Sequence, residues 1–346
     1  MEFEEYLKKQ KQLNEIRRLL KKIGTIKDCS HPTKEDCRLP IKNAHSLQRQ
    51  GSLKYLEKNK NGNAFVYCHK DREYNREHNF LDLKPIGRKD ASTFFGFCEF
   101  HDTEVFKIIE NNPEATDINN DEHCFLHTYR SFSHSYHIKY EEMKIFTSED
   151  LEIKSALSKA FGEDIVPMLS GIQMALSDFE IPKKRLDELL VDKKFSELNY
   201  LCFQIPYRCP VACSGVSTPG HFINNDPFNL STDLSYTYSD IFTTVLPLKD
   251  RTVIILASFL DDEKANRYLD EFENIKYELE FQKYLSFHII NNVQNTFISP
   301  LFYDKKNLLW KKNYCKLLDF IASSSTPFIS FNKHFPINYF SPTEKI

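Results

Sequence analysis

The sequence predicts an α+β protein in two parts, and three observations carry this prediction. A chain of 346 residues is long enough for about two domains, each with its own core. A hydrophobic fraction of 41% is typical of a globular protein, and nine cysteines without regular spacing suggest reduced thiols, some of them on a metal. We expect a zinc-stabilised domain over residues 1–145 and, over residues 146–346, a domain of antiparallel strands covered by helices.

The first part of the chain begins with a helical pattern. Residues 2–22 are amphipathic with helical spacing, and Gly24 is a typical helix end. The next predicted elements are a short helix at 41–48, a strand at 53–57, a hairpin strand at 64–68 after the Asn-Gly-Asn turn at 61–63, and a polar loop at 70–79.

Two further elements complete the first part. Residues 92–110 read as an aromatic strand that turns into a helix, and residues 122–140 read as a second helix after a loop. In the second helix Phe125, Tyr129, Phe132 and Tyr136 recur at helical spacing, which predicts a face directed at the core.

The second part changes character near residue 197. Helical patterns precede this point and strand-forming residues follow it. The predicted elements are three helices over 150–199 with breaks near Gly162 and Pro182, an apolar strand region at 198–211, a loop at 214–226, a hairpin formed by 241–248 and 251–259, and helical regions at 262–295 and 301–323.

The composition also bears on location and partners. No apolar stretch approaches the ~18 residues of a membrane span, and Met1 is followed by Glu2, Glu4 and Glu5 instead of a signal sequence. We therefore expect a cytoplasmic protein without a membrane partner.

The charge is unevenly distributed along the chain. Residues 1–101 hold 21 Lys and Arg against 14 Asp and Glu, whereas residues 102–346 hold 25 against 35. The basic N-terminal region could therefore bind DNA or RNA, and the alternative is that its lysines only solvate helix faces.

Four residues have the pattern of a structural zinc site. Cys29-x7-Cys37 and Cys98-x2-His101 supply two short ligand pairs, and the second pair lies where a strand turns into a helix. This order of knuckle, hairpin and helix predicts a treble clef. Four alternatives stay open, because His31 could replace Cys29, and His45, Cys68 or His69 could replace one of the ligands.

The same region resembles the HNH family of nucleases. Asn43-Ala44-His45 stands where the family has its histidine pair, and Phe97–Asp102 stands where the family helix opens. The resemblance implies that His45 is a general base and that Asp102 is the last ligand of a catalytic divalent cation, such as Mg²⁺ or Mn²⁺. It also implies that the four zinc ligands above, Cys29, Cys37, Cys98 and His101, have a structural role.

Two functional hypotheses follow from these residues. The first is a metal-dependent nucleic-acid phosphodiesterase, or a degenerate relative that only binds, of the kind found in bacterial phage defence; the stretch at 91–110 also resembles uncharacterised bacterial proteins. The second is a non-catalytic, zinc-stabilised component of a multicomponent system, whose C-terminal domain docks a protein partner.

A stripe of basic side chains follows the helix predicted at 122–140. His123, His127, Arg130, His134 and His137 fall on the side opposite its aromatic residues. They could bind phosphate or a second metal, and the alternative is ordinary solvation of a surface helix.

Two other groups have simpler interpretations. Cys209 and Cys213 with His221 could bind a metal, but buried strand thiols are the favoured interpretation. Asp102 and Glu110 could form a carboxylate pair, although acidic residues in a first helical turn are common for stability alone. No phosphate-binding loop motif occurs in the sequence, which disfavours that mode of nucleotide binding.

Overall fold

A computed structural model describes residues 25–38, 40–162, 165–230, 236–323 and 330–346 of the protein. The helix predicted at 2–22 and its end at Gly24 lie outside the described residues. None of the described helices combines the length and the apolar character that crossing a membrane requires.

The chain forms two compact units, each assembled from separate stretches of sequence. The first unit takes in the chain up to Ala44, Phe94–Thr103 and Ser133–Val191, and the second takes in His45–Thr93, Glu104–Phe132 and Asp192–Ile346. The units are thus interleaved, whereas the sequence suggested consecutive domains divided near residue 145. The prediction of a mixed α+β protein with antiparallel sheets is confirmed.

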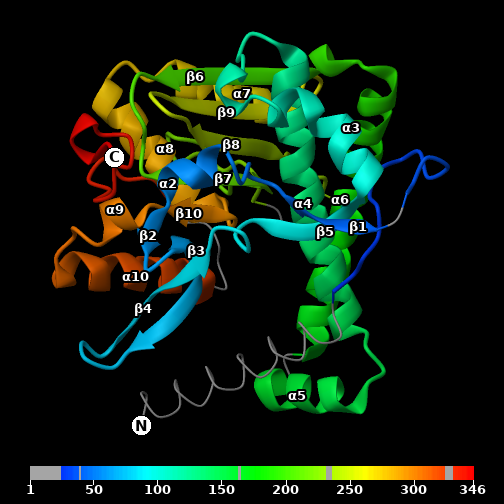
Figure 1. The fold of residues 1–346 in the computed structure, drawn as a ribbon, viewed down its shortest axis with the longest axis horizontal. Helices are drawn as coiled ribbons and strands as arrows, with labels where there is room; N and C mark the ends of the chain where they lie inside the picture. The colour runs from blue at the N-terminus through cyan, green and yellow to red at the C-terminus, as the bar shows by residue number, and fades with distance from the viewer. Residues whose placement is uncertain (1–24, 39, 163–164, 231–235, 324–329) are drawn as a thin grey trace. The chain divides into compact units, whose positions relative to one another are not determined.

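The second unit is built on an eight-stranded sheet (Figure 1). Its strands are β2 (Lys58–Lys60), β3 (Asn63–Asn75), β4 (Phe80–Gly87), β6 (Leu198–Ile205), β7 (Val211–Ser217), β8 (Ile241–Pro247), β9 (Thr252–Phe259) and β10 (Thr296–Ile298). They follow the order β2-β3-β10-β7-β8-β9-β6, with β4 paired to β3, and the strand pairs are antiparallel.

The short strand β10 connects an early part of the chain with a later part in this sheet, because it pairs with β3 on one side and with β7 on the other. Phe297 lies opposite Cys68 of β3 on one side and opposite Ala212 of β7 on the other. Residues 58–87 therefore share one sheet with residues 198–259, although more than a hundred residues separate them. This pairing explains why the second unit does not begin near residue 145.

Helices cover both faces of the central strands. Val253 and Ile255 of β9 belong to one cluster with α2 (Ser52–Leu56) and the start of α4 (Asp121–Phe146). Ile254 and Leu256 belong to the opposite cluster, with α7 (Glu263–Glu273) and α8 (Glu278–Asn292). Because side chains alternate along a strand, cover on both faces explains why every residue of β8 and β9 is buried and most of them are apolar. The helices α9 (Pro300–Tyr303) and α10 (Leu308–Ser323) complete the unit.

The first unit contains a small sheet and long helices. Strand β1 (Ile41–His45) pairs with β5 (Thr93–Cys98), and β5 leads directly into α3 (Glu99–Glu110). The helices α5 (Leu151–Phe161) and α6 (Ile165–Asp192) follow α4. Asp150 caps α5 by accepting hydrogen bonds from the backbone N–H groups of Glu152 and Ile153.

Four predicted features differ from the structure. Residues 41–45 of the helix predicted at 41–48 form strand β1, because they pair with β5, and residues 53–57 fall largely in helix α2 because Leu53 and Leu56 both face the core. The predicted loop at 70–79 belongs mainly to the β3–β4 hairpin. Pro182 lies inside α6 and does not end it, since its buried ring and the nearby buried Leu186 anchor the helix.

Three buried histidines predict a loss of stability in acid. Burial lowers the pKa of His69, His127 and His288 to about 3 in the folded protein, well below the ordinary value of about 6.5. The unfolded chain thus binds more protons below about pH 6.5, and each histidine removes up to about 1.4 kcal/mol of stability per pH unit as the pH falls toward 3.

Urea unfolding of the wild type and of His288→Gln at pH 7 and pH 5 tests this expectation. The free energy of unfolding should fall less between pH 7 and pH 5 in His288→Gln than in the wild type. The control His334→Gln replaces an exposed histidine, and its free energy of unfolding should fall as much as that of the wild type. If the free energy of unfolding of His288→Gln fell as much as that of the wild type, the lowered pKa of His288 would be contradicted.

Candidate metal centre

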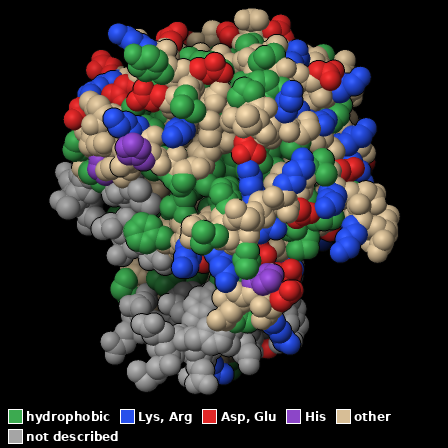
Figure 2. Space-filling model, turned by 90° about the vertical axis from the view of Figure 1, so that its left-hand side faces the viewer, with side chains coloured by type: hydrophobic (Ala, Val, Ile, Leu, Met, Phe, Trp, Pro, Cys, Tyr) green, Lys and Arg blue, Asp and Glu red, His purple; other side chains and the backbone are tan. Residues whose placement is uncertain are grey.

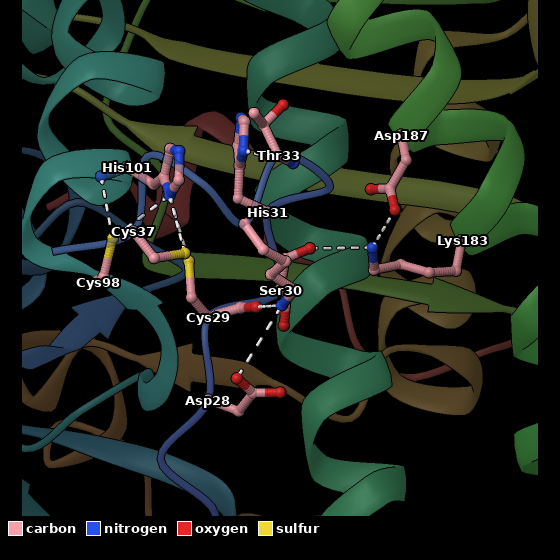
Figure 3. A network of polar contacts seen from close by, with 11 residues as sticks. Asp28, Cys29, Ser30, His31, Thr33, Cys37, Cys98, His101, Lys183 and Asp187 are labelled. Atoms are coloured by element: carbon pink, nitrogen blue, oxygen red, sulfur yellow. Dashed lines mark hydrogen bonds and ion pairs between the residues drawn. The ribbon is translucent and has the colours of Figure 1, made fainter. Parts of the chain in front are cut away.

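Three cysteines and one histidine converge at a single point in the first unit (Figure 3). Cys29 and Cys37 come from the segment before β1, Cys98 is the last residue of β5, and His101 lies in the first turn of α3. Their potential ligand atoms all lie within 4.8 Å of one another. The structure therefore brings together the four residues predicted from the sequence.

The distances in this cluster fit a tetrahedral zinc ion. His101 Nδ1 lies 3.4 Å from Cys29 Sγ, 3.6 Å from Cys37 Sγ and 3.3 Å from Cys98 Sγ. Ordinary Zn–S and Zn–N bond lengths in a tetrahedron give S···N edges of about 3.5 Å. Four protein ligands fill the coordination sphere, so the centre is compatible with structural zinc and offers no position for a substrate.

The backbone around the cluster is held by two strand-like hydrogen bonds. Ser30 N–H donates to Gly96 O at 2.7 Å, and Glu99 N–H donates to Pro40 O at 3.1 Å. These bonds hold both ends of the Cys29–Cys37 segment against β5 and the start of α3. Because α3 begins at Glu99, Cys98 and His101 lie on the same turn and can face one ion.

Burial and hydrogen bonding act in opposite directions on the thiols. Burial raises the pKa of Cys29 to about 12. For Cys98, burial also acts to raise the pKa, but backbone N–H groups of His101 and Arg38 together with the neighbouring thiols lower it overall. The His101 N–H lies 3.5 Å from the Cys98 sulfur. A bound divalent cation would favour the thiolate form of all three cysteines.

Two side chains support the cluster from outside. The His31 ring stacks on the His101 ring, with centroids 3.7 Å apart, and His31 Nδ1 accepts a hydrogen bond from the Thr33 N–H. Lys183 of α6 donates to Ser30 O at 2.9 Å and is paired with Asp187 (Figure 3). Burial lowers the pKa of His31 to about 4, so this ring is neutral at pH 7.

The alternative ligands lie elsewhere. His31 stacks on a ligand without joining the cluster, and Cys68 belongs to the core of the second unit. His69 Nε2 is hydrogen-bonded to the hydroxyl of Tyr314 at 2.6 Å. Cys209 and Cys213 are fully buried, and burial raises the pKa of both thiols, in keeping with the core interpretation.

The two residues predicted to be catalytic fall in different units. His45, at the end of β1, belongs to the second unit, where its Nδ1 lies 3.0 Å from Ala91 O. Asp102 is half-buried on α3 and belongs to the first unit. Their assignment to catalysis stays a prediction.

The basic stripe of α4 is buried along its whole length. His123, His127, Arg130, His134 and His137 are each at most 8% exposed, which excludes the interpretation of a solvated surface helix. The aromatic face opposite is buried as well at its first three positions, so this part of α4 is enclosed on both sides. A role of the stripe in binding phosphate or a second metal stays a prediction.

The residues of the stripe have different surroundings in the two units. In the second unit, His123 Nδ1 accepts a hydrogen bond from the Asp117 N–H, and Arg130 pairs with Glu110 at 2.6 Å. In the first unit, His134 and His137 both contact the ring of Phe94.

The ion pair of Arg130 and Glu110, which lies in the second unit and outside the metal cluster, was not predicted from the sequence. Arg130 is 1% exposed and also lies over the Phe106 ring, 4.5 Å from its centroid. From the sequence, Glu110 was paired only with Asp102. An arginine twenty residues away on the next helix gives no local signal of such a contact.

Loss of the metal ligand Cys98 should abolish zinc binding. We expect about one zinc per wild-type chain and none in Cys98→Ser, with a lower melting temperature, because the two remaining thiols and an imidazole would lose their common ion. Elemental analysis of the purified proteins measures the metal. Cys209→Ser removes a buried thiol outside the cluster and should retain the zinc; equal zinc in Cys98→Ser would refute the ligand set.

Comparisons with known proteins give no relative for this chain. No protein-family model matches it, and neither the curated proteins nor the solved structures yield a significant match. The function must therefore be argued from the arrangement of its own residues.

Proposed function

We propose that this protein is a metal-dependent nucleic-acid phosphodiesterase in which His45 is the general base. One observation carries the proposal: the hydrogen bond between His45 and the Ala91 carbonyl. A carbonyl oxygen only accepts hydrogen bonds, so Nδ1 of His45 carries the proton. In the neutral ring, Nε2 then has a free lone pair that can take a proton from water.

The electrostatic surroundings keep His45 neutral. Burial is the main cause of its lowered pKa, and the positive charges of Arg130 and Arg49 act in the same direction. The Ala91 carbonyl and Glu110 act in the opposite direction and only reduce the shift. At neutral pH the ring is therefore available as a base.

In this proposal Arg130 acts on the base and not on the substrate, because its guanidinium is 1% exposed and paired with Glu110. Glu110 together with the Phe106 ring fixes the orientation of the guanidinium. The positive charge of Arg130 lowers the pKa of His45, so the two side chains interact electrostatically.

The reaction would then proceed by attack of water on the phosphorus atom. His45 Nε2 takes the proton of the water as the new P–O bond forms, and the bond between phosphorus and the leaving oxygen breaks. A divalent cation such as Mg²⁺ or Mn²⁺, when bound, would supply charge stabilisation at the phosphate. In this proposal β1, β5 and α3 form the hairpin and helix of an HNH-like treble clef, with residues 46–92 inserted between the strands.

The zinc centre would have only a structural part in this function. It holds the segment before β1 to β5 and to the start of α3. The distribution of surface charge indicates where nucleic acid would bind. Figure 2 shows acidic and basic side chains of the described residues interspersed over one face of the molecule. A polyanion favours a surface of one charge, so we propose that it binds elsewhere.

The saturated coordination of the metal centre favours a second candidate function. A zinc ion held by four protein side chains catalyses nothing. The protein would then be a non-catalytic component whose C-terminal residues dock a protein partner. In that case Cys98→Ser would lose the partner along with the zinc, and no metal-dependent cleavage would be measurable.

His45→Ala should reduce cleavage at least about 100-fold, since a general base contributes about 10²–10⁴-fold. The assay follows cleavage of plasmid DNA and of single-stranded RNA with added Mg²⁺ or Mn²⁺. Zinc content and melting temperature should remain at wild-type values, and His78→Ala, in the β3–β4 turn, should cleave normally. Wild-type cleavage by His45→Ala would disprove the assignment.

The pH dependence of cleavage gives an independent test. The base works only when deprotonated, and its pKa is lowered, so the rate should fall with acid only below about pH 6.5, the ordinary histidine value. Arg130→Gln removes a positive charge that lowers this pKa, so the acid limb should move to higher pH. If the acid side of the pH–rate profile stayed in place in Arg130→Gln, the proposed effect of Arg130 on the pKa of His45 would be contradicted.

A further inference from the structure

Two thiols of the second unit are in direct contact. Cys124 Sγ, on the first turn of α4, lies 3.8 Å from Cys202 Sγ, on β6. Outside the metal centre, this is the only contact between cysteine sulfurs among the described residues. The two residues are 78 positions apart in the sequence, so the fold alone brings their sulfurs together.

The two thiols differ in their access to solvent. Cys202 is partly exposed on β6, which is the last strand in the order of the sheet. Cys124 is 1% exposed and also lies 3.6 Å from the Ile118 carbonyl. The hydrogen bond with Cys202, followed by burial, raises the pKa of the Cys124 thiol. An oxidant from solvent therefore meets Cys202 first, and Cys124 is placed as the resolving thiol.

We propose that Cys124 and Cys202 are a redox modification site that a peroxide converts into a disulfide. The Cys202 sulfur attacks one peroxide oxygen as its S–H proton is lost, the O–O bond breaks, the other oxygen leaves as water, and a sulfenic acid forms on Cys202. The Cys124 sulfur then attacks the Cys202 sulfur and displaces water. Overall, two thiols are oxidised by two electrons and one hydrogen peroxide is reduced to two waters.

Little movement is needed to form this bond. The sulfurs must close from 3.8 Å to the about 2.05 Å of a disulfide. The bond would tie the first turn of α4 to β6. His127 and Arg130 follow Cys124 on the same helix, so the oxidised protein would hold these buried residues more rigidly. The inference rests on the thiol pair alone and is independent of the proposed function.

Peptide mapping of the full-length protein tests the proposal. The zinc-loaded protein is treated with equimolar hydrogen peroxide, its remaining thiols are alkylated, and it is digested with trypsin. Cleavage after Lys107 and Arg130 isolates Cys124, and cleavage after Lys194 and Arg208 isolates Cys202. We expect these two peptides to be joined, with the loss of two hydrogen atoms, and to separate after treatment with a dithiol.

The same digest contains a matched control. The peptide over residues 209–249 holds both Cys209 and Cys213, which are close in sequence, and it should remain fully alkylated. Oxidation should raise the melting temperature of the wild type by several degrees, because the cross-link closes a long loop. Cys202→Ser should show no such rise.

Three results would overturn the proposal. The first is Cys202 oxidised or alkylated by itself, without the cross-linked peptide. The second is a cross-link that forms as readily in urea-unfolded protein as in the native protein, because then the fold does not direct it. The third is an equal rise in melting temperature in Cys202→Ser.

Discussion

The meeting of three thiols and one imidazole at a single point is the constraint on which the metal-binding region depends. Each of these groups would lose hydration on burial, and a shared zinc ion would repay that loss for all four at once. The cluster sets the position of the residues before β1, which have little apolar sequence of their own. It also holds the turn from β5 into α3, so the ends of both elements are determined by the positions of the ligands.

The second unit depends on a different constraint, the cover of one sheet on both faces. The strands β8 and β9 bury every residue, which requires helices on each side. The three residues of β10 connect this core to the β3–β4 hairpin from the first hundred residues. Helix α4 passes through buried surroundings while carrying histidines and an arginine, so its polar groups must find partners inside the protein. The pair of Arg130 and Glu110 is one such solution.

The part of the candidate site that could be predicted from sequence is the part encoded locally. Cys98 and His101 lie on one turn, and a pair at this spacing in a strand-to-helix turn predicts two ligands for one ion. The contacts of His45 and Arg130 could not be predicted, because Ala91 and Glu110 are 46 and 20 residues away and no spacing rule relates them. The burial of the α4 stripe was missed for the same reason: periodicity identifies the faces of a helix but not the number of faces that are covered.

The sequence by itself determined the mixed α+β class, the hairpin of β8 and β9, the turn from β5 into α3 and the identity of four potential metal ligands. These depend on local patterns: alternation, turn residues and ligand spacing. Tertiary structure decided the interleaving of the two units, the strand at 41–45, the passage of α6 through Pro182 and the tautomer of His45. Each of these results from pairing or packing between distant residues, whose free energy outweighs the local preference of the chain and leaves no periodic signal in the sequence.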